Sequence, residues 1–122
     1  MKMRFSLLIT ILFLILLTLG CAQKPTECNF PEGIQCSNLK LTKDSISFDI
    51  TNNLEDIGTI SFKTDGCTES AKHGMRKGDA KTYTLSNCNN KGYVEKTVTI
   101  EYNYMSIDFR DIKTGTIKGM VQ

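Results

Sequence analysis

The alternation of apolar and polar residues after Cys36 constrains the fold more than any other feature of the sequence. In the longest stretch, one parity is largely apolar and comprises Val94, Val98, Ile100, Tyr102 and Tyr104. Successive side chains of a β-strand point to opposite faces of a sheet, so a period of two predicts strands with one buried and one solvated face. Turn-forming pairs such as Asn52-Asn53 and Asp65-Gly66 separate the stretches.

About seven short segments of this kind follow one another, and no stretch after Cys21 has helical periodicity. They lie around residues 39–41, 46–50, 60–62, 83–85, 94–104, 107–109 and 117. This spacing predicts an all-β domain, namely an antiparallel immunoglobulin-like β-sandwich of about seven strands. A small barrel is the alternative. The sequence has no tryptophan, so it lacks the buried tryptophan of antibody domains.

The N-terminal segment has the layout of an export signal. Lys2 and Arg4 precede an apolar run from Phe5 to Gly20, and Cys21 follows the run directly. This arrangement resembles a bacterial or archaeal lipoprotein signal, which implies cleavage before Cys21 and a lipid on Cys21. Two alternatives remain open: an uncleaved N-terminal hydrophobic anchor helix of about 16 residues, and ordinary secretion.

The signal divides the chain into three parts. We expect residues 1–20 to form a signal peptide or membrane anchor, residues 21–27 a short polar tether, and residues 28–122 one disulfide-stapled β-sandwich domain. Basic residues next to an apolar segment stay on the cytoplasmic side of a membrane. We therefore expect the domain to be attached to the cell membrane on its extracytoplasmic face.

The number of cysteines agrees with export. The chain has five, Cys21, Cys28, Cys36, Cys67 and Cys88, and lipidation of the first leaves an even number for disulfides. Four cysteines allow three connectivities, and the sequence alone does not select one. We favour Cys28–Cys36 and Cys67–Cys88, because sequential pairing needs only local closure. A zinc site is disfavoured, because no two of these cysteines have the close spacing of zinc ligands.

The charge of the exported part gives no sign of a nucleic-acid partner. Removal of Lys2 and Arg4 leaves 13 of the 15 basic residues, which equals the 13 acidic ones. Domains that bind nucleic acid usually present a clustered basic face. We therefore do not expect nucleic acid as a partner. The N-terminal segment makes the membrane one expected partner, and a protein or glycan at the cell surface is the other candidate.

The sequence offers no catalytic constellation. His73 is the only histidine, and it lies in a segment that we expect to be a loop. The cysteines that could serve as nucleophiles are expected to be oxidised. We interpret His73 as a solvated loop residue and predict that the protein is not an enzyme. The adjacent cations Lys72, Arg76 and Lys77 form either a charged loop or a contact for lipid phosphate or an acidic glycan.

Metal and carbohydrate sites are also weakly indicated. The acidic residues do not follow the spacing of a calcium-binding loop, and they include Asp44, Asp49, Glu55, Asp56, Asp65 and Glu69. Glu95 and Glu101 would lie about 20 Å apart on one strand, too far for a glycosidase pair. We expect Tyr102, Tyr104 and Phe109 to pack in the core and not to form a platform for sugars. No metal or cofactor is predicted.

The order of cysteines and strands resembles a class of small archaeal proteins that are secreted or membrane-anchored, often pilin-like, and of unknown function. The residues that carry the resemblance are the run Cys28-Asn29-Phe30-Pro31-Glu32-Gly33-Ile34-Gln35-Cys36, two later strands that lead to Cys67 and Cys88, and a glycine-flanked terminal strand, 115–121. The resemblance implies a β-sandwich head at the cell surface. No pilin processing site precedes the apolar run, which favours a lipid-anchored relative over a filament subunit.

These observations lead to two functional hypotheses. The first is a non-enzymatic cell-surface lipoprotein that acts in adhesion, envelope structure or partner binding, through loops or an exposed sheet edge. The second is a binding subunit that captures a small ligand or an ion for a membrane complex. A pocket with converging polar groups would favour the second hypothesis.

Overall fold

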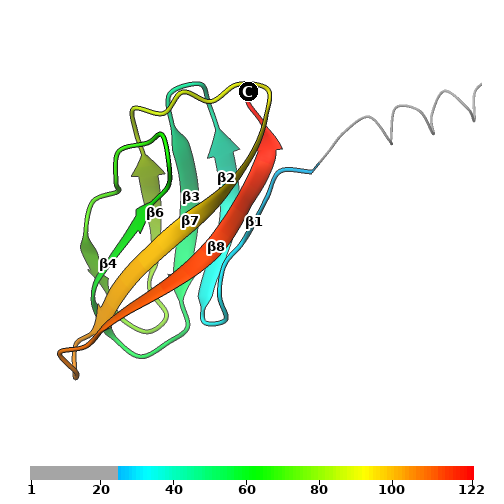
Figure 1. Ribbon diagram of the computed structural model, residues 1–122. Helices are drawn as coiled ribbons and strands as arrows, with labels where there is room; N and C mark the ends of the chain where they lie inside the picture. Colours follow the sequence, from blue (N-terminus) through cyan, green and yellow to red (C-terminus); the bar gives the residue numbers. More distant parts are fainter. Residues whose placement is uncertain (1–24) are drawn as a thin grey trace, which may run out of the picture.

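The computed structural model describes residues 25–122, which form eight β-strands and no helix (Figure 1). The strands are β1 (Glu27–Asn29), β2 (Ile34–Leu41), β3 (Ile46–Asn52), β4 (Ile57–Lys63), β5 (His73–Met75), β6 (Ala80–Leu85), β7 (Tyr93–Tyr104) and β8 (Arg110–Met120). The all-β prediction is confirmed for this part of the chain. The expected anchor helix and Cys21 lie outside the described residues.

Two antiparallel sheets pack against each other. The larger has the strand order β1-β8-β7-β4-β5, and the smaller has the order β2-β3-β6. In Figure 1 the long strands β7 and β8 cross in front of β2 and β3. Buried residues from both sheets form one apolar cluster, so the sheets enclose a common core. The structure is therefore a β-sandwich, as the strand spacing predicts.

Several details of the strand prediction are wrong. The described part of the chain has eight strands, and the sequence does not predict two of them, β1 and β5, because they carry no clear alternation. His73 begins β5 and does not lie in a loop. A strand at 107–109 does not form, because residues 105–109 make the turn between β7 and β8. The terminal strand is longer than expected and runs without a break from Arg110 to Met120.

The alternating residues form the core as expected. Ile46, Phe48 and Ile50 of β3 are fully buried, while the residues between them are partly exposed. Three rings from both sheets meet at the centre: Phe62 of β4 lies 5.1 Å from Phe48 and 4.7 Å from Tyr83, measured between ring centroids. Burial of each such side chain stabilises the fold by about 1.5–3 kcal/mol. The contacts of Phe62 with Phe48 and Tyr83 therefore hold the larger sheet against the smaller one.

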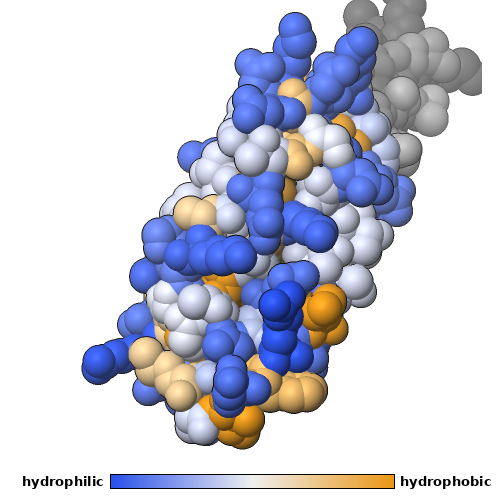
Figure 2. Space-filling view, turned by 60° about the vertical axis from the view of Figure 1, so that its left-hand side comes forward, coloured by the Kyte–Doolittle hydropathy of each residue, from blue (hydrophilic) through white to orange (hydrophobic). Residues whose placement is uncertain are grey.

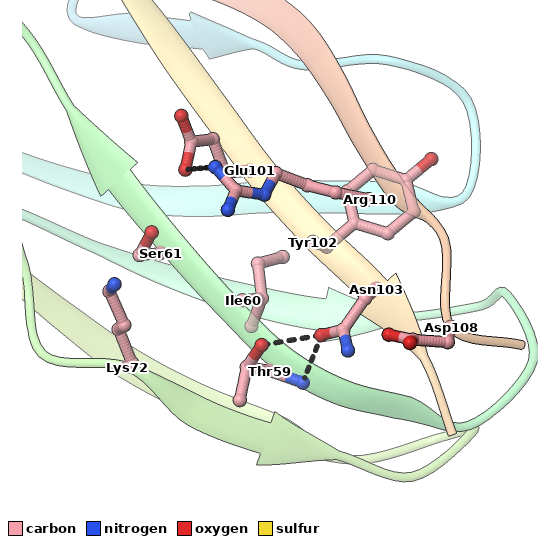
Figure 3. Close-up of a pocket in the computed structure, with 9 residues that line it drawn as sticks. All are labelled: Thr59, Ile60, Ser61, Lys72, Glu101, Tyr102, Asn103, Asp108 and Arg110. Carbon is pink, nitrogen blue, oxygen red and sulfur yellow. Dashed lines mark hydrogen bonds and ion pairs between the residues drawn. The ribbon is translucent and has the colours of Figure 1, made fainter.

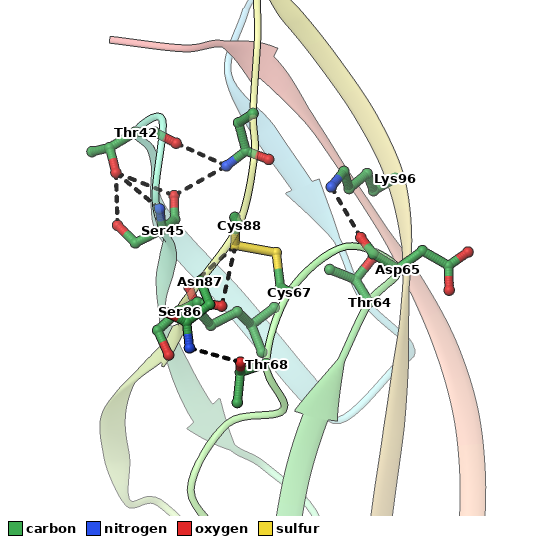
Figure 4. Close-up of a disulfide and its surroundings, with 12 residues drawn as sticks. Thr42, Ser45, Thr64, Asp65, Cys67, Thr68, Ser86, Asn87, Cys88 and Lys96 are labelled. Atoms are coloured by element: carbon green, nitrogen blue, oxygen red, sulfur yellow. Dashed lines mark hydrogen bonds between the residues drawn. A yellow bond between two sulfur atoms is a disulfide. The ribbon is translucent and has the colours of Figure 1, made fainter.

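Both expected disulfides form, and each joins the two sheets. Cys28 in β1 is bonded to Cys36 in β2, so this bridge closes the turn at Pro31–Gly33 and also links the larger sheet to the smaller. Cys67 follows β4 and Cys88 follows β6, so the second bridge links the sheets at their rim (Figure 4). The preference for sequential pairing is confirmed.

Hydrogen bonds hold the loops around the second bridge (Figure 4). The side-chain amide of Asn90 donates to the carbonyl oxygens of Thr42 and Ser45, at 2.8 and 3.3 Å. The ammonium of Lys96 donates to the carbonyl oxygen of Asp65 at 3.0 Å. These bonds order the rim that carries the C-terminus. The turn between β7 and β8 lies at the opposite end of the sandwich.

Candidate interaction surface at the end of the β7–β8 hairpin

The hairpin of β7 and β8 is the longest element of the described chain. Its register pairs Tyr93 with Met120 at one end and Asn103 with Arg110 at the other. The turn lies at the lower left of Figure 1, at the opposite end of the sandwich from the C-terminus. Glu27 of β1 pairs with Lys118 near that C-terminal end. The turn is therefore far from the point where the chain enters the fold.

Apolar side chains at this turn are exposed. Met105, Ile107 and Phe109, which we call the apolar tip, are 61%, 57% and 65% exposed. Ile112, two residues into β8, is 57% exposed. Figure 2 shows apolar side chains gathered toward the lower end of the molecule. Exposed apolar residues that cluster in this way mark interaction surfaces more often than scattered ones do.

The expected core packing of the three aromatic residues is confirmed only in part. Tyr102 is buried, and Tyr104 is half-buried with its ring 5.6 Å from that of Tyr102. Phe109 is exposed, so its predicted core position is wrong. The physical reason is that Phe109 lies in the turn and not on a strand, where alternation would decide its direction. The signal that could have revealed this is the polar pair Ser106 and Asp108, which is typical of a turn.

A polar pocket of about 320 Å³ lies beside the apolar tip on the outer face of the larger sheet (Figure 3). Its residues come from β4, β7, β8, the turn between β7 and β8, and the loop before β5. Thr59 donates two hydrogen bonds to the side-chain oxygen of Asn103, from its amide at 3.0 Å and from its hydroxyl at 2.5 Å. Glu101 and Arg110 form an ion pair of 3.5 Å across β7 and β8.

The pocket combines both signs of charge with neutral hydrogen-bonding groups. Lys72 and Arg110 supply positive charge, and Glu101 and Asp108 supply negative charge. The hydroxyl of Ser61 donates to Glu69 at 3.0 Å. Such a surface can hold a small polar molecule by hydrogen bonds. The polar residues Thr59, Glu101 and Asn103 carry no recognisable sequence motif, so only their pairing across β4 and β7 reveals the pocket.

The expected cationic cluster is divided in the structure. Lys72 lines the pocket, whereas Arg76 and Lys77 lie in the turn after β5. The backbone amides of Arg76 and Lys77 are held by the carboxylates of Asp79 and Asp56, each at 2.9 Å. The ring of His73 lies 6.0 Å from that of Tyr83. The structure thus brings Lys72 to the candidate surface and leaves the other cations in a turn.

The acidic residues that we considered for calcium are dispersed. Within residues 25–122, no group of three or more His, Cys, Asp or Glu side chains has the arrangement of a metal site. Asp49 instead accepts hydrogen bonds from Asn38 and Thr82, and these bonds lower the pKa of its carboxyl group. Glu95 is exposed near the start of β7, six residues from Glu101.

A partly buried hydrogen bond links the two strands in the distal part of the hairpin. Tyr102 of β7 donates its hydroxyl to Asp111 of β8 at 3.0 Å. Burial of the ring, together with this bond to a carboxylate, raises the pKa of Tyr102 above its ordinary value. The bond ties β7 to β8 close to the turn that joins them.

Comparisons with known proteins give no relative: no family model, curated protein or solved structure matches this chain. The resemblance to small archaeal surface proteins therefore stays a prediction. Residues 25–122 contain no helix with the length and apolar character needed to cross a bilayer.

Proposed function

We propose that this protein is a non-enzymatic lipoprotein of the cell surface, with an immunoglobulin-like β-sandwich head that binds a partner or mediates adhesion. The single observation that carries the proposal is the apolar tip, Met105, Ile107 and Phe109, at the end of the hairpin. When a partner covers exposed apolar residues at the end of a hairpin, their removal from water stabilises the complex.

The position of the tip fits a tethered protein. The chain enters the larger sheet at Glu27, which pairs with Lys118. Between Lys118 and Arg110, β8 spans about 26 Å at about 3.3 Å per residue. A lipid on Cys21 would hold the Glu27 end near the membrane. The tip would then point toward neighbouring cells or envelope components, where an adhesive surface is useful.

The two disulfides agree with this location. Bonds between Cys28 and Cys36 and between Cys67 and Cys88 persist in oxidising compartments such as the outside of the cell. Both bonds link the two sheets, so they add to the rigidity that the common core gives the head. A rigid head suits a protein that transmits force from its tip to its membrane anchor.

An adhesion assay tests the role of the tip. Cells that display the full-length protein are compared with cells that display the variant Met105→Ser/Ile107→Ser/Phe109→Ser. We expect the variant to lose most attachment to neighbouring cells. Met120→Ser is the matched control, because Met120 is 49% exposed at the other end of β8. Equal attachment by the tip variant and the native protein would refute a role of the tip.

The membrane anchor has its own test. The mass of the native protein under non-reducing conditions reports cleavage, lipid and disulfides together. We expect a chain that begins at a lipid-bearing Cys21 and contains two disulfides. A chain that still carries residues 1–20 would contradict the lipoprotein hypothesis and leave the uncleaved anchor.

The polar pocket favours a second candidate function, capture of a small polar ligand. Amino acids and monosaccharides match its mixture of charges and hydroxyl groups. Titration with each at millimolar concentration, followed by amide NMR, should shift the signals of Thr59, Asn103 and Arg110 if the pocket binds them. Unchanged signals would count against this candidate and leave the tip as the functional surface.

A further inference from the structure

The distal half of β8 is an open sheet edge. Residues 110–114 pair with β7 on one side, and no strand of the described chain lies on the other. β1 ends at Asn29, opposite Thr116. Phe30 then covers Gly115, where an added Cβ would lie 2.4 Å from the ring. Residues 110–114, which we call the open edge, therefore present unpaired backbone groups that another strand can bind.

The other edges of the two sheets are less suited to pairing. β1 and β5 have three residues each. The pairing of β2 with β3 shifts register between Ser37 and Lys40, where Asn38 has a φ of 52°. Along β6, the ammonium of Lys81 donates to the carbonyl oxygen of Gly74. The open edge is thus the regular edge segment that lies beside the apolar tip.

The charges of the open edge match those of a second copy in one register. In an antiparallel pair with its two-fold axis at Ile112, Ile112 lies opposite itself and Asp111 lies opposite Lys113. An axis at Asp111 or at Lys113 would place two like charges opposite each other, which destabilises a strand pair. Charged residues on an edge strand normally prevent indiscriminate pairing. Here they are self-complementary about Ile112. An axis at Arg110 would again place like charges opposite each other, and an axis at Thr114 would place Ile112 opposite Thr116, which already pairs with Asn29 of β1.

We propose that the open edge binds the open edge of a second copy of this chain, as an antiparallel strand pair centred on Ile112. The proposal rests on the adhesive function proposed above and names the partner. Outward-facing Ile112 is 57% exposed, and the pairing would cover it with its own counterpart. Phe109 of each copy would approach Phe30 of the other, because β1 ends there.

The geometry places the two copies on facing membranes. Each Glu27 lies at the level of Lys118, six residues from the two-fold axis. Antiparallel pairing therefore puts the two N-terminal ends about 40 Å apart along the strands, at opposite ends of the dimer. Lipids attached to those ends would insert into two facing membranes more readily than into one. Such a dimer would connect two cells.

A short strand pair buries little surface, so each contact is weak and transient. Many copies on one membrane would make the total attachment strong, because linked contacts reinforce one another. The weakness of each contact means that the pairing has to be measured at high protein concentration. We expect a dissociation constant in the micromolar range or weaker in solution.

Charge variants test the pairing in the full-length protein, solubilised in detergent and studied by sedimentation equilibrium. Lys113→Asp and Asp111→Lys each place like charges opposite each other, so each should weaken self-association by about tenfold or more. An equal mixture of the two variants should recover the native affinity, because every charge again faces its opposite. Lys91→Asp, in the loop before β7, is the control and should change nothing. Thermal unfolding verifies that each variant folds.

A cross-link tests the register. Ile112→Cys should form a disulfide-linked dimer under mild oxidation, because the two residues meet on the axis. Thr114→Cys should not, because the two Thr114 residues would lie about 13 Å apart. A native protein that stays monomeric at its highest soluble concentration, with no Ile112→Cys dimer, overturns the proposal.

Vesicles test the arrangement across two membranes. Phosphatidylcholine vesicles that carry the native protein should aggregate and scatter light, and vesicles with Lys113→Asp should do so only when mixed with vesicles that carry Asp111→Lys. Dimers in detergent without aggregation of native vesicles overturn the placement on facing membranes. Cell attachment that survives both charge variants but is lost in the tip variant overturns the second copy as partner and retains the proposed function.

Discussion

Tyr102 and Asp111 lie directly opposite each other on β7 and β8, and the tyrosine hydroxyl donates to the carboxylate at 3.0 Å. Tyr83 provides the contrast. It is buried to the same extent, 2% exposed, but within the described chain its hydroxyl has no hydrogen-bond partner. The two tyrosines thus form a matched pair in which only one buried hydroxyl is satisfied.

Replacement of each tyrosine by phenylalanine should have opposite effects on stability. Tyr102→Phe removes a hydrogen bond to a carboxylate and should lower the free energy of unfolding by about 1.5 kcal/mol. Tyr83→Phe removes a buried hydroxyl that lacks a partner, so it should be neutral or raise the free energy by about 1 kcal/mol. Urea unfolding of both variants measures the difference. Equal losses would contradict the hydrogen-bond assignment.

Stability should fall at alkaline pH. Burial raises the pKa of Tyr83 from 10.0 to about 12, and the pKa of Tyr102 is raised in the same direction. Between pH about 10 and about 12, the unfolded chain has lost protons that the folded chain retains, so rising pH favours unfolding. One such group contributes a slope of at most about 1.4 kcal/mol per pH unit. Tyr83→Phe should show a shallower decline in urea unfolding at these pH values; an unchanged slope would exclude Tyr83 as a cause.

The sequence predicts the buried strands well because alternation follows from burial. Ile46, Phe48 and Ile50 have one parity and occupy the core of β3. The pairing of cysteines was also predictable, since local closure favours neighbours in the sequence. The two shortest strands, β1 and β5, were not predictable. Each has three residues, too few for a period of two to appear, and each forms by pairing with the edge of a longer strand, β8 or β4.

The candidate surface was predicted less well than the core. Phe109 and Ile107 are apolar, and hydrophobicity alone suggests burial. Their exposure depends on where the β7–β8 register ends, and the sequence does not determine that register locally. The open edge likewise depends on strand pairing, here between segments far apart in the sequence. It exists only because β1 stops pairing with β8 at Asn29. Surface features of this kind arise from pairing between distant segments.

Gly115 should be intolerant of a side chain. A Cβ at this position would lie 2.4 Å from the Phe30 ring and 3.0 Å from the carbonyl oxygen of Asn29. Gly115→Ala should therefore lower the free energy of unfolding by about 1–3 kcal/mol, as overpacking does. Gly58→Ala is the control, because its Cβ would meet no atom closer than 3.6 Å. Addition of Phe30→Leu should recover part of the loss; no recovery would place the clash at the backbone of Asn29.

The two disulfides should differ in what they contribute. Their cysteines are 8 and 21 residues apart, and chain-entropy arguments give about 2.5 kcal/mol for the shorter loop and about 3.3 kcal/mol for the longer. We expect Cys28→Ser/Cys36→Ser to remain folded at 25 °C with reduced stability, and Cys67→Ser/Cys88→Ser to lose more. Urea unfolding of both variants, with the mass of each confirming its remaining bridge, measures the order. A larger loss from the first variant would mean that the Cys28–Cys36 link between β1 and β2 stabilises the fold mainly by holding β1 on β8.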